Sequence, residues 1–217
     1  IFEIFKNNYL EPGSLSGNAV YTIYESNDQI LWIGTYAAGI NVYKKEKQKF
    51  NLLNTICQKG QRLNNRSVLC FAEAPNGEIL VGTDGGGLNV LDTVNNSIKY
   101  ITTKNSSLHS DIIKTLYFDK YGYLWIGSYG KGLCRYNYQN GLKSKSKVFL
   151  EGKGIWKIIG DHDGNIWIAS LNTIYTIYLH KSGEIKSEPN IKLEAALGIT
   201  NDMMLDSKGN IWVCTAS

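Results

Sequence analysis

Residues 113–128 read IKTLYFDKYGYLWIGS, and four other stretches of the chain align with them without a gap. These stretches are residues 20–35 (VYTIYESNDQILWIGT), 68–83 (VLCFAEAPNGEILVGT), 155–170 (IWKIIGDHDGNIWIAS) and 200–215 (TNDMMLDSKGNIWVCT). Their first residues lie 48, 45, 42 and 45 positions apart along the chain. A repeat of this length built from short strands is typical of the four-stranded blades of a β-propeller.

Each repeat begins with a predicted hairpin. Residues such as Ile113 to Phe118 are apolar or β-branched at most positions, which suits a strand buried on both faces. A tight turn follows at residues 119–122, where aspartate can bond the backbone two residues on and glycine supplies the positive φ. Residues 161–164 and 206–209 repeat this turn, whereas residues 26–29 lack its glycine.

The second strand of each repeat alternates a bulky side chain with a very small one. The bulky residues are Trp32, Leu80, Trp125, Trp167 and Trp212. Two positions later stand Gly34, Gly82, Gly127, Ala169 and Cys214. We expect the bulky residues and the glycines to form the core between neighbouring blades, where a large group fills the gap and a small one allows close approach. The alternative for the tryptophans is a platform on which sugars stack.

Third and fourth strands complete four of the repeats. The predicted blades are residues 20–53, 68–102, 113–150 and 155–194, with a partial blade at 200–217. Residues 1–5 are predicted to be the outer strand of a preceding or closing blade. The sequence therefore predicts an all-β chain, residues 1–217 forming one fragment of a β-propeller. We expect its open edges to be covered by self-association or by the remainder of a larger propeller ectodomain.

The composition excludes several other classes. The chain has 217 residues, of which 43% are hydrophobic, so it can bury a sizeable core and is not expected to be disordered. No apolar run approaches the roughly 18 residues of a membrane-spanning helix. The net charge of +4 is spread over single lysines rather than gathered in a basic patch, so no nucleic-acid partner is expected.

Cysteines and histidines give no sign of a metal site. The four cysteines are Cys57, Cys70, Cys134 and Cys214, and no two of them form a C-x-x-C pair. The three histidines are His109, His162 and His180, and their spacing matches no metal site. We expect no metal and no cofactor. The cysteines are predicted to be unreactive thiols, with one long-range disulfide as the alternative.

The repeat resembles that of the two-component regulator propeller family. The motif is carried by Asp119, Gly122, Leu124, Trp125, Ile126, Gly127, Gly132, Leu133 and Tyr136. The resemblance implies the periplasmic sensor region of a hybrid two-component histidine kinase, which detects oligosaccharides and controls polysaccharide-utilisation genes. It also implies that this fragment is not an enzyme, although its parent chain is a histidine kinase. Any membrane attachment would then come from other parts of the parent chain.

Geometry predicts where a ligand would bind. The crossings between blades and the turns after the second strands should share one face, because first and second strands are antiparallel. Aromatic rings and hydrogen-bonding groups on that face would suit an oligosaccharide, the alternative being ordinary surface residues. The candidate residues are Asn18, Tyr36, Arg66, Asp84, Asp111, Tyr129, Lys131 and Asn172.

Two other functions stay open at this point. A propeller lyase or hydrolase predicts histidines or carboxylates that converge at the hub. A scaffold for other proteins predicts an exposed apolar face.

Overall fold

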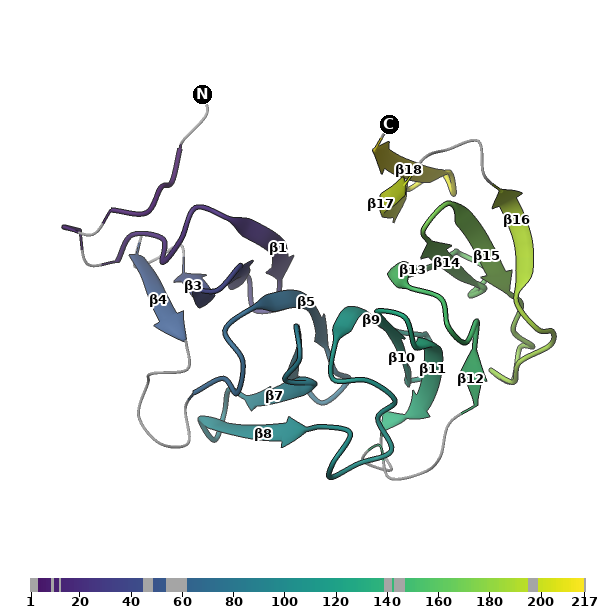
Figure 1. Ribbon diagram of the computed structural model, residues 1–217, viewed down its shortest axis with the longest axis horizontal. Coiled ribbons are helices and arrows are strands. Elements are labelled where there is room, and N and C mark those ends of the chain that lie inside the picture. Colours follow the sequence, from purple (N-terminus) through teal and green to yellow (C-terminus); the bar gives the residue numbers. More distant parts are fainter. Residues whose placement is uncertain are drawn as a thin grey trace. The chain divides into compact units, whose positions relative to one another are not determined.

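The computed structural model describes residues 4–8, 10–11, 13–44, 49–53, 62–138, 142, 147–194 and 199–216, with only the backbone of 49–51, 53, 193 and 194. They divide into two compact units, unit 1 (Ile1–Thr102) and unit 2 (Thr103–Ser217). Each unit contains small sheets of antiparallel strands that pair in chain order, seen as separate groups of arrows in Figure 1. The predicted all-β class is confirmed.

Unit 1 contains two four-stranded blades. Blade 1 consists of β1 (Val20–Glu25), β2 (Leu31–Thr35), β3 (Gly39–Lys44) and β4 (Lys49–Leu53). Blade 2 consists of β5 (Val68–Glu73), β6 (Ile79–Thr83), β7 (Leu88–Asp92) and β8 (Ser97–Ile101). Strands β1 and β5, the first of each blade, lie side by side.

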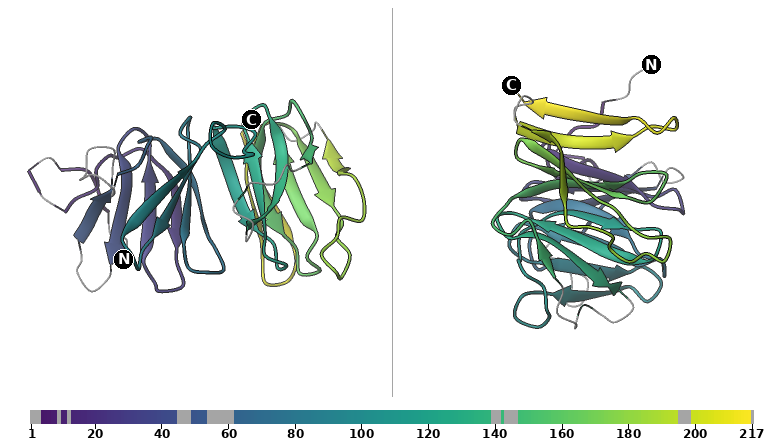
Figure 2. Two further views of the ribbon diagram at one scale, coloured as in Figure 1. Left: turned by 90° about the horizontal axis from the view of Figure 1, so that it is seen from below. Right: turned by 90° about the vertical axis from the view of Figure 1, so that its right-hand side faces the viewer.

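Unit 2 contains two blades and a further hairpin. Blade 3 consists of β9 (Ile113–Phe118), β10 (Tyr123–Ser128), β11 (Gly132–Asn137) and β12 (Val148–Phe149). Blade 4 consists of β13 (Ile155–Gly160), β14 (Ile166–Ser170), β15 (Thr173–Ile177) and β16 (Asn190–Glu194). The hairpin pairs β17 (Ile199–Leu205) with β18 (Ile211–Ala216) and is drawn in yellow in Figure 2.

The hairpin turns form as their residues predict. Gly122, Gly164 and Gly209 all have positive φ, between 81° and 90°. In blade 1 the same position is held by Gln29, which takes a φ of 61° in place of the missing glycine. The turn geometry is therefore kept where its preferred residue is absent, at the cost of a left-handed conformation for a residue with a Cβ.

Close approach explains the glycine two positions after the bulky residue. A Cβ added to Gly127 would lie 2.6 Å from the Cγ2 atoms of both Thr115 and Ile155. Thr115 belongs to the same blade, whereas Ile155 lies on the first strand of blade 4. Glycine at this position thus lets β13 pack directly against the sheet of blade 3.

The bulky residues differ in burial. Trp125 and Leu80 are fully buried, Trp32 is 5% exposed, and Trp167 is partly buried. Trp212, expected in an inter-blade core, is instead 61% exposed. It lies on the terminal hairpin, and no blade follows that hairpin within the described residues.

Two further sheet faces bear on the predicted partners. On β1, Tyr21 is 57% exposed and Ile23 is 64% exposed, and on β17 Met204 is 58% exposed. A neighbouring blade or a second copy would cover these side chains, and that stays a prediction. Of the predicted outer strand at residues 1–5, Ile4 and Phe5 lie outside any strand, and 1–3 lie outside the described residues.

The aspartate of the hairpin turn also holds the tryptophan. The indole N–H of Trp125 donates to Asp119 at 2.9 Å, in addition to the turn bonds that Asp119 accepts from Tyr121 and Tyr123. The other such pairs are Trp167 with Asp161 at 3.0 Å, Trp212 with Asp206 at 2.9 Å, and Trp32 with Ser26 at 3.2 Å. The repeat therefore couples turn and core through one side chain.

Candidate functional site

Backbone hydrogen bonds hold the turns after the second strands against the crossings between blades. In blade 1, Tyr36 N donates to Ala19 O at 3.0 Å, and Gly39 N donates to Arg66 O at 2.9 Å in the next crossing. In unit 2, Gly132 N donates to Lys153 O at 2.9 Å in the same way. Within each unit, turns and crossings therefore form one face, which we call the loop face.

Buried side chains fix this face. The hydroxyls of Thr35, Thr83 and Ser128, each the last residue of its second strand, donate to the carbonyl of the glycine that ends the turn, at 2.7–3.0 Å. Asn89, fully buried on β7, accepts a bond from Asn64 N at 2.9 Å and donates to its side chain at 2.8 Å. The loop face is thus attached rigidly to the sheets beneath it.

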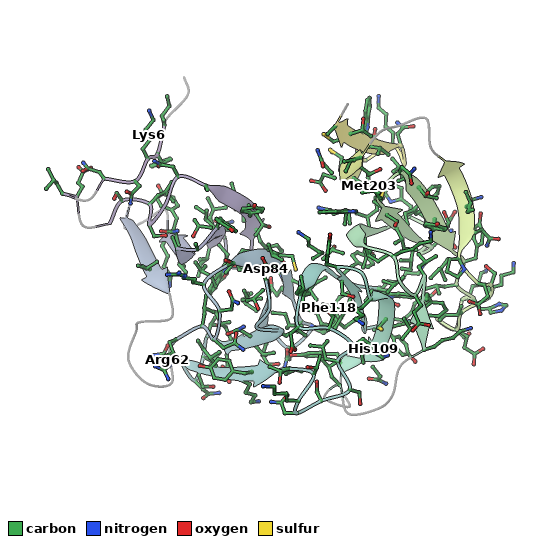
Figure 3. All side chains as sticks on the ribbon, viewed as in Figure 1. Lys6, Arg62, Asp84, His109, Phe118 and Met203 are labelled. Carbon is green, nitrogen blue, oxygen red and sulfur yellow. The ribbon has the colours of Figure 1, made fainter. Side chains whose placement is uncertain are left out.

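The candidate residues of unit 1 lie together at this face. Tyr36 is 53% exposed and its ring contacts that of Tyr21, with centroids 5.5 Å apart. The exposed Asp84, labelled in Figure 3, donates its N–H to Ser67 O at 3.0 Å, next to Arg66. Asn18 is also exposed, and its Oδ1 accepts a bond from Asn7 N.

The candidate residues of unit 2 are less uniform. Tyr129 is 57% exposed, and Lys131 and Asn172 are exposed in the turns after β10 and β14. Asp111 already accepts bonds from the N–H and hydroxyl of Thr103, at 2.8 and 2.9 Å, so its carboxylate serves the loop itself. The ligand-binding role of all eight candidates stays a prediction.

Sequence reasoning missed three loop-face residues in the first strands, Tyr21, Lys114 and Trp156. The Nζ of Lys114 lies 4.7 Å from the ring centroid of Trp156, and the Tyr129 ring meets that indole edge-on at 6.3 Å. A signal was available, because the second position of the repeat holds Tyr, Leu, Lys, Trp and Asn while its neighbours are mostly apolar.

Cysteine and histidine side chains form no chemical centre in the described part of the chain. Cys70 and Cys134 are buried free thiols, Cys214 is an exposed free thiol, and Cys57 lies outside the described residues. Burial raises the pKa of the Cys134 thiol to about 11, which keeps it protonated and unreactive. His109 Nδ1 lies 3.1 Å from the Tyr136 hydroxyl, which donates to Ser107 O. The described residues contain no group of three His, Cys, Asp or Glu that could hold a metal.

A cleft of about 470 Å³ lies away from the loop face, between the hairpin turns of blades 1 and 2. Its lining includes Asp28, Glu73 and Glu78. Glu73 accepts bonds from the Tyr24 hydroxyl at 2.9 Å and from Asn27 at 3.0 and 3.1 Å. Burial, followed by the contact with Glu73, raises the pKa of Tyr24. Through these bonds Glu73, on β5, connects blade 2 to blade 1.

The blades and their loop face define a β-propeller. The sequence model of the two component regulator propeller matches residues 14–37 and 107–130, so the predicted repeat is confirmed. The search of curated proteins found no match.

Solved structures give the relationship in more detail. The extracellular domain of the hybrid two component system BT3049 from B. thetaiotaomicron is 26% identical, with a TM-score of 0.76 over 98% of this chain and 28% of that one. That of BT4673 from the same organism is 20% identical, with a TM-score of 0.73 over 92% of this chain and 28% of that one. The chain is homologous to extracellular domains of hybrid two-component systems, and it spans just over a quarter of their length.

A propeller enzyme also shares the fold. Virginiamycin B lyase from Staphylococcus aureus is 14% identical, with a TM-score of 0.65 over 90% of this chain and 62% of that one. At this identity the likeness concerns the fold alone.

Proposed function

We propose that this chain is part of the extracytoplasmic, ligand-sensing region of a hybrid two-component histidine kinase. The observation that carries the proposal is the homology to the extracellular domain of such a system, which extends over 98% of the chain. No helix of the described residues is long and apolar enough to cross a bilayer. The sensor would be periplasmic, and its membrane and kinase parts would lie elsewhere in the parent protein.

The proposed ligand is an oligosaccharide, and the proposed output is control of polysaccharide-utilisation genes. Exposed aromatic rings at the loop face, Tyr36 in unit 1 and Tyr129 in unit 2, support this choice, since sugar rings stack on aromatic side chains. The loops of the same face also carry exposed hydrogen-bonding groups, such as Asn18 in unit 1 and Asn172 in unit 2. The sugar can act as a signal only if it binds one arrangement of the receptor better than another.

Calorimetry on the intact extracytoplasmic region tests the proposal, with a panel of neutral and uronate-containing oligosaccharides. We expect saturable binding of at least one oligosaccharide. Tyr36→Ala or Tyr129→Ala should weaken it, whereas Tyr121→Ala, in a hairpin turn at the opposite end of the strands, serves as the control. Absence of binding to every member of the panel would overturn oligosaccharide sensing.

A further inference from the structure

All five first strands carry a β-bulge at the second residue of the repeat. Pairing with the second strand skips one position between Val20 and Thr22, between Val68 and Cys70, and at the same place in the other three repeats. A bulge places an extra residue in one strand and re-aims its side chain. The bulged residues are Tyr21, Leu69, Lys114, Trp156 and Asn201.

The bulge frees this position from the uniform packing of the repeat. The preceding position is Val, Val, Ile, Ile and Thr, whereas the bulged residues share no chemistry. In unit 2 three consecutive first strands supply a lysine, a tryptophan and an asparagine. Lys114 and Trp156 contact each other, as described above, and Lys114 has no ion pair within the described residues.

Trp156 differs from the four other tryptophans. Each of those donates its indole N–H to the first residue of its own hairpin turn. The Nε1 of Trp156 is buried and has no hydrogen-bond partner in the described part of the chain. A buried N–H without a partner is unfavourable, so a bound acceptor that reached this nitrogen would stabilise the protein.

The space beside Gly154 is where such an acceptor fits. A Cβ built on Gly154 would lie 3.9 Å from each of three atoms, Trp156 Nε1, Gly130 N and Tyr129 Cδ2. Two nitrogens and an aromatic edge therefore border one small space, with the Lys114 ammonium over the face of the same indole. The carboxylate of the neighbouring first strand, that of Asp202 on β17, is paired with Lys157 at 2.7 Å.

We propose that this space, bordered by Tyr129, Gly130 N, Gly154 and the indole of Trp156 over which Lys114 lies, binds the carboxylate of a uronic acid in an acidic oligosaccharide. Two N–H groups and an ammonium suit the two oxygens of a carboxylate. The Tyr129 ring supplies an apolar surface for the sugar ring. The inference rests on the proposed sensor function and names the class of oligosaccharide.

The test is calorimetry of the intact extracytoplasmic region with trigalacturonate, its neutral methyl ester and a sulfated disaccharide. We expect trigalacturonate to bind and the ester to bind about tenfold or more weakly, because hydrogen bonds to a charged group contribute about 1.5–3 kcal/mol. Equal affinity for acid and ester, or binding of the sulfated sugar alone, would overturn the proposal. Binding of neutral oligosaccharides only would overturn it and leave the sensor function standing, while no binding to any sugar removes both.

Three variants locate the site. Gly154→Ala places a methyl group in the space at ordinary contact distance, so the protein should fold normally and lose binding of trigalacturonate about tenfold or more. Lys114→Met and Trp156→Phe should weaken the acid far more than the ester. Lys120→Met is the matched control, since Lys120 also lies over an aromatic ring, that of Tyr121, but in the hairpin turn. Unchanged affinity in Gly154→Ala, or an equal loss in Lys120→Met, would count against the site.

Discussion

Blades 2 and 3 fill the same three positions with opposite chemistry. In blade 3 the hairpin turn, second strand and third strand contribute Asp119, Trp125 and Arg135, which are joined by bonds of 2.9 Å from the indole N–H and from Arg135 Nη2 to the carboxylate. In blade 2 the corresponding residues are Ala74, Leu80 and Val90, all at most 4% exposed. The cross-strand partners Trp125 with Arg135 and Leu80 with Val90 occupy the same register.

The two sets of residues show that the three positions change together. A buried indole N–H requires an acceptor, a buried carboxylate requires donors, and a buried guanidinium requires an anion. Arg135 and Asp119 have side-chain exposures of only 9% and 1%. Asp119 is therefore the partner of both Trp125 and Arg135, and the apolar set of blade 2 needs no such partner. Leu80 therefore replaces the tryptophan together with matching changes at the other two positions, Ala74 and Val90.

The largest expected effect is that of Asp119→Ala. This change leaves the Arg135 guanidinium buried without its carboxylate and removes the acceptor of Trp125, so the free energy of unfolding should fall by about 3–5 kcal/mol. Urea unfolding of the intact protein measures it. Asp206→Ala is the matched control, because it removes the same indole bond from the exposed Trp212, and a loss as large as that of Asp119→Ala would contradict the argument.

The second prediction concerns a triple variant that gives blade 3 the three apolar residues of blade 2. The triple variant Asp119→Ala, Trp125→Leu and Arg135→Val removes the buried charges and the buried indole N–H together. It still loses the turn bonds from Tyr121 and Tyr123, and the smaller Leu leaves some space unfilled. Its loss of unfolding free energy should be smaller than the sum of the three single losses by about 2 kcal/mol or more. Additive losses, measured by the same urea unfolding, would mean that the three side chains act independently.

Much of the fold was predictable from sequence because the same pattern of strand and turn residues occurs in five aligned repeats. The hairpin turns, the strand positions and the glycine at Gly127 followed from alternation and turn chemistry. The link between Asp119 and Trp125 was not predicted, because the turn alone explains an aspartate there. Its sequence signal is the joint change to Ala74 and Leu80 in blade 2.

The candidate site was predictable only in part. Antiparallel strand order placed the turns and crossings on one face, and their hydrogen bonds bear this geometry out. The bulges were not predictable, since an extra residue in a strand leaves the 16-residue repeat gapless and is visible only in the pairing. Trp156 was missed because it lies inside a strand and outside the repeated tryptophan position, and its signal was the varied chemistry of the second repeat position.

The smallest expected effect is on the pH dependence of the unfolding free energy. It separates the hairpin turns that begin with an aspartate from that of blade 2, which begins with Ala74. Burial would raise the pKa of Asp161, but bonds from Trp167 and Asn165 outweigh it and the pKa is lowered. For Asp206 the bond from Trp212, followed by those from Asn210, lowers the pKa to about 2. Because these pKa values are lower in the folded state, the stability they contribute is present above the ordinary value of 3.8 and is lost as pH falls through the folded value.

Urea unfolding at about pH 5 and about pH 3 tests this expectation. Asp161→Asn keeps an oxygen that can accept the indole bond, but this side chain cannot titrate. The free energy of unfolding of the variant should therefore fall less between the two pH values than that of the unchanged protein. The difference should be no more than about 1 kcal/mol, because the site is partly exposed. Asn165→Ala keeps the carboxylate and loses one of its donors, at 3.0 Å, so its pH dependence should lie between the two. Identical pH dependence in all three proteins would show that the hairpin aspartates gain no proton-linked stability from their indole partners, and that the polar blades differ from blade 2 only in packing.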